Sequence, residues 1–183
     1  DDIARIFPKC IPVGKQFGVM IVVQADHHFE VATFRAEGPY LDGRHPEGVS
    51  FTTPEEDAKR RDFTVNGLFH DPVKDRVIDY VGGREDIRAK CIRTIGDPED
   101  RFQEDRLRLI RAVRFAANLN FSIGPKTWEA IRKLGKEIHS VSQERIRDEL
   151  VKMFTRPNAG RALELLSESG LLAEILPEIE TMK

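Results

Sequence analysis

The feature that most constrains the fold of this sequence is a change of pattern near residue 95. Before it, short β-rich runs are interrupted by Gly, Pro and Asp, and after it apolar residues recur at helical spacing. The pattern predicts an α+β protein with two parts. Residues 1–96 form a mixed-sheet domain, and residues 97–183 form an all-helical domain. A chain of 183 residues is long enough to bury a core.

Charge and cysteine content exclude several classes of protein. The 29 basic and 31 acidic residues give a net charge of −2, which excludes a broadly basic nucleic-acid coat but leaves a local basic groove open. No apolar run approaches the roughly 18 residues of a membrane-spanning helix. Cys10 and Cys91 lie far apart and match no metal-binding spacing. We therefore expect a cytoplasmic protein without a membrane partner.

The first part contains a predicted hairpin. The continuous β-branched run Val19–Val23 predicts a strand buried on both faces. Residues 29–34 alternate in polarity, which predicts a second strand joined to the first by a polar break at residues 26–28. Gly82 and Gly83 favour a turn from a strand into a short helix, because no phosphate-loop spacing follows them.

The second part reads as four helices. Asp97 is a predicted N-cap for a helix that continues through Leu119. Three further helices are expected over residues 127–139, 142–154 and 159–166.

The stretch Arg60-Arg61-Asp62 has two interpretations. Adjacent guanidinium groups suit a polyphosphate, and the neighbouring carboxylate suits a ribose hydroxyl. Alternatively, Asp62 caps a helix and the arginines are solvated. This stretch alone favours the second interpretation.

Asp105 and Arg108 are three residues apart, which predicts neighbours on one helical face. They form either a surface ion pair worth about 0.3–0.5 kcal/mol or a site that reads a nucleobase. Adenine and cytosine present an amine donor beside a ring-nitrogen acceptor, whereas guanine and uracil present a carbonyl beside a ring N–H. A carboxylate next to a guanidinium would accept the first two bases and reject the others, at roughly 1–3 kcal/mol for each mismatched buried group.

Arginines continue along the same predicted helix. Arg108, Arg111 and Arg114 form a stripe that suits phosphate or RNA backbone, or a solvated face balanced by Glu104 and Asp105. Spacing alone does not decide between the two. Arg44 lies in a loop rich in Gly and Pro, where a phosphate contact and a plain turn are equally open.

Six segments, in the same order, resemble those of the class II RNA nucleotidyltransferases, the family of bacterial tRNA CCA-adding enzymes, A-adding enzymes and poly(A) polymerases. They are residues 12–19, 30–35, 42–46, 60–66, 79–83 and 104–115. Each segment is short, but their common order over roughly residues 5–121 makes the resemblance specific.

The resemblance implies a partial DNA polymerase beta-like head followed by a helical neck and the start of a body. It also implies roles for particular side chains. Arg61 and Asp62 would bind the ribose and triphosphate, and Asp105 and Arg108 would read the base. The candidate phosphate- or RNA-binding residues are Arg44, Arg60, Arg111 and Arg114. Glu30 is a candidate accessory catalytic carboxylate, with a sheet-edge acid as the alternative.

The sequence departs from the family at the metal motif. The family transfers nucleotides with two Mg²⁺ ions, for which it uses an Asp-x-Asp, and these 183 residues contain none. We expect this motif to lie upstream of Asp1, so that the chain is a fragment truncated at both ends and is inactive or nearly so by itself. Sheet edges left unpaired by missing strands predict self-association.

The predicted function is template-independent addition of CMP and AMP, from CTP and ATP, to tRNA 3′ ends. A poly(A) polymerase of the same family and a noncatalytic nucleotide- or RNA-binding remnant remain alternatives. The expected partners are tRNA or another RNA and nucleoside triphosphates, with Mg²⁺ as cofactor of the full-length enzyme.

Overall fold

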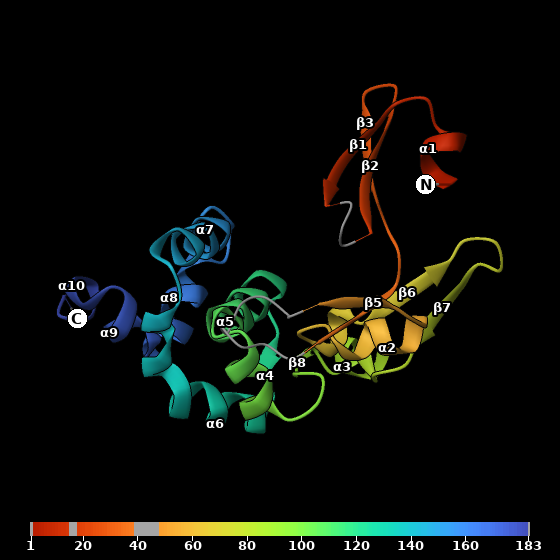
Figure 1. The fold of residues 1–183 in the computed structure, drawn as a ribbon. Helices are drawn as coiled ribbons and strands as arrows, with labels where there is room; N and C mark the ends of the chain where they lie inside the picture. The colour runs from red at the N-terminus through yellow and green to blue at the C-terminus, as the bar shows by residue number, and fades with distance from the viewer. Residues whose placement is uncertain (1, 15–17, 39–47, 183) are drawn as a thin grey trace. The chain divides into compact units, whose positions relative to one another are not determined.

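The computed structural model describes residues 2–14, 18–38 and 48–182. These residues form two compact units, the first ending at Asp57 and the second starting at Ala58. Strands predominate before residue 95 and helices after it, which confirms the predicted α+β class (Figure 1). The domain boundary predicted at residue 96 falls within the second unit and stays a prediction.

The first unit is built on a three-stranded antiparallel sheet in the order β1-β2-β3. The predicted hairpin is confirmed, but its turn is at Ala25 and Asp26, and the two histidines that follow are in the strand. Ala25 takes the left-handed backbone conformation, with φ 51°, that a tight turn requires. The elements of this unit are α1 (Asp2–Ile6), β1 (Cys10–Gly14), β2 (Val19–Gln24), β3 (His27–Ala32), β4 (Arg35–Glu37) and β5 (Val49–Phe51).

Strand β2 is less buried than its composition predicts. Val22 is 3% exposed and is the one buried apolar residue among the described residues of the first unit. The prediction of a strand buried on both faces is therefore wrong. A continuous apolar run is typical of strands covered by helices on both faces. Strand β2 lies between β1 and β3 in the sheet, and β3 is largely exposed.

The second unit begins with short elements that follow α2 (Pro54–Lys59), the helix at the boundary. They are η2 (Thr64–Asn66), β6 (Leu68–Asp71), β7 (Arg76–Asp79), α3 (Gly83–Arg88) and β8 (Cys91–Ile92). Strands β6 and β7 form an antiparallel hairpin. Strand β8 pairs in parallel with β9 (Ser122–Ile123), which follows the longest helix of the unit.

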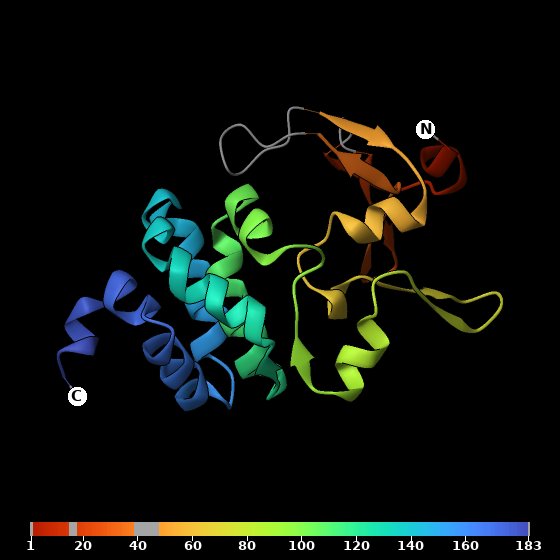
Figure 2. The same cartoon turned by 90° about the horizontal axis from the view of Figure 1, so that it is seen from below.

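The helical part of the second unit packs around α5. The helices are α4 (Pro98–Glu104), α5 (Leu107–Leu119), α6 (Pro125–Leu134), η3 (Gly135–Ser140), α7 (Gln143–Phe154), α8 (Ala159–Glu168), α9 (Leu171–Ile175) and α10 (Pro177–Glu180). Figure 2 shows them in green to blue, and α5 packs against both α7 and α8. Its Leu109, Ile110 and Val113 have no exposed surface and lie in the centre of the core.

Several predicted helix limits are confirmed, and others are not. Asp97 caps α4 by accepting from the backbone N–H groups of Glu99 and Asp100, and Ser142 is the N-cap residue of α7. The helix expected to run from Asp97 through Leu119 is instead two helices, because the backbone is extended at Asp105 (φ −147°, ψ 105°). The second predicted helix ends as α-helix at Leu134 and continues as a 3₁₀ segment.

Within the described ranges, no helix has the length and apolar character needed to cross a membrane.

Candidate functional site

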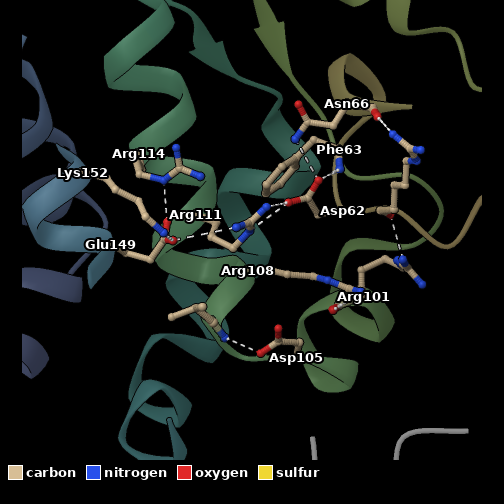
Figure 3. Close-up of polar contacts among 12 residues, drawn as sticks. Asp62, Phe63, Asn66, Arg101, Asp105, Arg108, Arg111, Arg114, Glu149 and Lys152 are labelled. Carbon is tan, nitrogen blue, oxygen red and sulfur yellow. Dashed lines mark hydrogen bonds and ion pairs between the residues drawn. The ribbon is translucent and has the colours of Figure 1, made fainter. Parts of the chain in front are cut away.

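Asp62 lies at the centre of a polar cluster in the second unit (Figure 3). It is 9% exposed, and its Oδ1 accepts from the Phe63 backbone N–H at 2.8 Å and from Asn66 Nδ2 at 2.9 Å. Its Oδ2 accepts from Nε and Nη2 of Arg111, at 2.9 and 2.5 Å. Burial raises the pKa of Asp62, but the Arg111 charge and these hydrogen bonds outweigh it and hold the pKa below its ordinary value.

Arg111 also faces a second buried carboxylate. Its Nη1 lies 3.8 Å from Oε1 of Glu149, a residue of α7 that is 2% exposed. Glu149 accepts in addition from Arg114 Nε and from Lys152 Nζ, at 2.5 and 3.0 Å. Arg111 and Arg114 of α5 thus bind protein carboxylates instead of presenting an open basic stripe. Their contact with phosphate or RNA stays a prediction.

Asp105 and Arg108 are adjacent but are not bonded to one another through their side chains. Asp105 lies in the break between α4 and α5, so the prediction of one helical face is wrong: the extended backbone turns it out of the helical register. Its Oδ1 accepts from the Leu107 N–H at 3.1 Å, and its Oδ2 accepts from Arg145 at 2.9 Å. Arg108 Nη1 donates to Glu104 Oε2 at 2.6 Å and to the Arg101 carbonyl at 2.9 Å.

The stretch around Arg60 and Arg61 is tied to α4. Arg101 Nη2 donates to the carbonyl oxygens of both residues, at 2.6 and 2.8 Å. The Arg61 side chain donates to the Asn66 carbonyl at 2.9 Å and lies 4.7 Å above the centre of the Phe69 ring. The structure therefore brings together two segments that are 40 residues apart in the sequence. Binding of phosphate by Arg60 and Arg61 stays a prediction.

Two candidate residues lie elsewhere. Glu30 is an exposed residue of β3 in the first unit, with Ile21 as its cross-strand neighbour. Its accessory catalytic role stays a prediction. Arg44 lies outside the described residues.

The turn at Gly82 and Gly83 has a structural role. The Asp79 carboxylate accepts from the backbone N–H groups of residues 81, 82, 83 and 84, at 2.9 to 3.1 Å. Burial raises the pKa of Asp79, but these bonds outweigh it and hold the pKa below its ordinary value. Gly82 is the N-cap residue of α3, in the left-handed conformation. This confirms a strand-to-helix turn, in which a carboxylate of the chain already occupies the amide groups.

The polar cluster includes residues that sequence reasoning missed. Arg101, Arg145 and Glu149 belong to helices α4 and α7 and hold the segments described above. Their spacing within each helix carries no signal of these long-range contacts, because the partners Arg60, Arg61, Asp105 and Arg114 lie outside the helix concerned. The Arg101–Glu104 spacing indicates only a local ion pair.

The described residues do not fit the magnesium ions that the resemblance implies. Within residues 2–14, 18–38 and 48–182, no group of three or more His, Cys, Asp or Glu side chains is arranged to hold a metal ion. Mg²⁺ needs clustered oxygen ligands. No chemical step is therefore assigned to a metal bound by these residues.

Comparison with known proteins gives matches along almost the whole chain. Residues 1–93 match the model of the poly(A) polymerase head domain, and residues 120–183 match that of the probable RNA- and SrmB-binding site of polymerase A. The CCA-adding enzyme of Geobacillus stearothermophilus is 46% identical over 94% of this chain and 43% of its own length. That of Bacillus subtilis is 44% identical over 96% of this chain and 44% of its own length.

A solved structure gives the same result. The crystal structure of the Bacillus stearothermophilus CCA-adding enzyme in complex with CTP has a TM-score of 0.85 and 43% identity, over 95% of this chain and 42% of that one. The chain thus spans less than half the length of the relatives it matches. From the head-domain match and these relatives, the chain belongs to the class II RNA nucleotidyltransferase family of CCA-adding enzymes and poly(A) polymerases.

Proposed function

We propose that this chain is the nucleotide-selecting part of a tRNA 3′-end nucleotidyltransferase that adds CMP and AMP from CTP and ATP. The observation that carries this proposal is the match to CCA-adding enzymes, at 46% identity over 94% of the chain. The chain includes both the segment around Asp62 and the segment around Asp105. The same match supports tRNA as the RNA partner.

Base selection rests on Asp105 and Arg108. Each side chain is held by other groups and not by the other, so Asp105 would serve as the acceptor and Arg108 as the donor for a base. Cytosine would donate its N4 amine to Asp105 and accept at N3 from Arg108. Adenine would use N6 and N1 in the same way. Uracil and guanine would place a carbonyl against the carboxylate, at a cost of roughly 1–3 kcal/mol.

The segment of Arg61 and Asp62 would bind the sugar and the phosphates. Asp62 is ionised and therefore an acceptor. A ribose hydroxyl would share an oxygen that already accepts from protein donors. The Arg61 guanidinium, held above Phe69, suits a phosphate oxygen. Because Arg111 binds Asp62 and lies on the helix that begins beside Asp105, sugar and base recognition would both involve α5.

We propose further that residues 1–183 alone do not catalyse addition. The sequence contains no Asp-x-Asp, which supports this proposal. The match of residues 120–183 to the probable RNA- and SrmB-binding site of polymerase A supports the second candidate function, a noncatalytic nucleotide- or RNA-binding protein. In either case the chain would bind CTP and ATP in preference to UTP and GTP.

A chimera tests the proposed function. The chain would replace the matching segment of the Geobacillus stearothermophilus enzyme, and the chimera would be given Mg²⁺, a tRNA without its 3′ CCA, and labelled nucleotides singly and together. We expect C and A to be added in sequence, and no addition by the chain alone. The parent enzyme and a melting curve of the chimera are the controls.

Each other outcome has a meaning. A long run of A would identify a poly(A) polymerase. Addition limited to a terminal A would identify an A-adding enzyme. A folded chimera that binds CTP and ATP but adds neither would support the noncatalytic candidate, and one that incorporates U or G equally would contradict base selection by this chain.

A further inference from the structure

Arg145 reaches the candidate base-reading site from a separate helix. It lies in the first turn of α7, and its Nη2 donates to Asp105 Oδ2 at 2.9 Å, the contact marked at Asp105 in Figure 3. The two residues are 40 positions apart in the sequence. The Arg145 side chain is 24% exposed and the Asp105 side chain 17% exposed, so the contact is at the edge of the core.

The contact completes a two-point hold on the Asp105 carboxylate. Oδ1 accepts from the Leu107 backbone N–H at 3.1 Å, and Oδ2 accepts from Arg145. The torsion that rotates a carboxylate is broad, so one hydrogen bond leaves the plane of the group free to turn. Two donors on different oxygens fix this plane and thereby the direction of the remaining lone pairs.

Arg108 is fixed independently of Arg145. Its Nη1 donates to Glu104 and to the Arg101 carbonyl, both on α4. A change at Arg145 therefore alters the orientation of the acceptor and leaves the donor in place. This separation makes the role of Arg145 measurable.

We propose that Arg145 is a positioning residue for base selection: it orients the Asp105 carboxylate so that the group accepts the exocyclic amine of cytosine or adenine. This inference rests on the proposed function, in which Asp105 reads the base. Without Arg145 the carboxylate is held at one oxygen and turns. Cytosine then binds more weakly because its exocyclic amine loses part of its hydrogen bond to Asp105. Uracil loses little affinity because it makes no such hydrogen bond.

A positioning role of Arg145 differs from a purely structural role in its effect on nucleotide affinity. An ion pair with both partners partly exposed contributes little to stability. A structural role would change the affinity for all four nucleotides together. A positioning role changes the ratio of the dissociation constants for UTP and CTP.

The test measures binding of CTP, ATP, UTP and GTP to the chain of residues 1–183 by calorimetry. In Arg145→Ala we expect the UTP to CTP ratio of dissociation constants to fall by about tenfold, mainly through weaker CTP binding. Arg145→Lys, which keeps a charged donor but loses the fork, should lie between the two. The matched control is Arg147→Ala on the same helix, because Arg147 pairs with its exposed neighbour Asp148 at 3.1 Å.

The outcomes distinguish this inference from the proposed function. A selective wild-type chain with an unchanged ratio in folded Arg145→Ala overturns the inference alone. A wild-type chain that binds CTP and UTP equally overturns base selection and the inference with it. If Arg145→Ala does not fold, Arg145→Gln replaces it, and a wild-type ratio in that variant overturns the inference. An equal loss for all four nucleotides assigns Arg145 a structural role and also overturns it.

Discussion

Two buried carboxylates bind three of the cations of the second unit. Asp62 is paired with Arg111, and Glu149 accepts from Arg114 and Lys152 and faces Arg111 as well. Arg111 thus lies between both carboxylates and links the segment of Asp62 to α7. A buried charge is tolerated only when it is paired. Loss of one of these carboxylates would leave its arginines without a counter-charge, and loss of the arginines would leave the carboxylate without one.

Glu149 gives a prediction for stability. Glu149→Gln removes the charge that compensates Arg114, whose side chain is only 12% exposed. We expect the free energy of unfolding to fall by about 3 kcal/mol, because one partner of a buried ion pair is left alone. Urea unfolding measures this. The control is Glu164→Gln, which loses an exposed pair with Arg161 and should change stability by less than about 0.5 kcal/mol. Equal effects would contradict the prediction.

Asp62 gives a prediction for how the stability of the fold depends on pH. Its pKa in the folded chain lies below the ordinary value, so its ionised form stabilises the fold above about pH 4, and this contribution is lost as the pH falls through the folded pKa. We expect the urea midpoint to fall on acidification and to fall less steeply in Asp62→Asn. Asp79, whose pKa is also lowered, keeps part of the slope in the variant. Identical slopes in the two proteins would contradict the prediction.

At the scale of elements, the sequence predicts the features that depend only on residues close together in the chain. The N-cap at Asp97, the helix start near Ser142 and the turn at Gly82 follow from local patterns and were predictable. The break at Asp105 was not, because the flanking residues keep helical spacing and the carboxylate gains its second partner from α7. The polar cluster was only half predictable for the same reason: Asp62 stood out in the sequence, whereas its partner on α5 depends on tertiary packing.

The turn before α3 provides a prediction about backbone packing. A Cβ at Gly83 would lie 2.2 Å from the Thr64 carbonyl oxygen, and backbone cannot yield as a side chain can. We expect Gly83→Ala to lower the free energy of unfolding by about 3 kcal/mol. The control is Gly160→Ala in α8, where a Cβ meets no neighbour and the change should stabilise by about 0.5–1 kcal/mol. Equal melting temperatures for the two variants would contradict the prediction.

At the scale of the whole molecule, the two units differ in how they are stabilised. The hydrophobic core of the second unit is centred on α5, whereas the described residues of the first unit contain one buried apolar side chain, Val22. A three-stranded sheet with so little buried surface is marginal by itself. In the described ranges its edge strand β3 pairs with β2 alone.

This sheet edge predicts self-association of the chain. Phe29 on β3 is 52% exposed, and an unpaired edge strand is a template for pairing with a second copy. We expect the weight-average mass in sedimentation equilibrium to rise with concentration. Phe29→Lys should suppress this rise, and Val73→Lys, which changes an exposed residue in the turn between β6 and β7, should not. A monomer at all concentrations would contradict the prediction.

The parallel pairing of β8 with β9 has a mechanical consequence. Cys91 and Ile92 pair with Ser122 and Ile123. The segment between them, which carries Asp105, Arg108 and Arg111, therefore forms a closed loop. The β8–β9 bonds would therefore bear part of any tension applied along the chain at the two ends of this segment. The break at Asp105 lies within this closed segment.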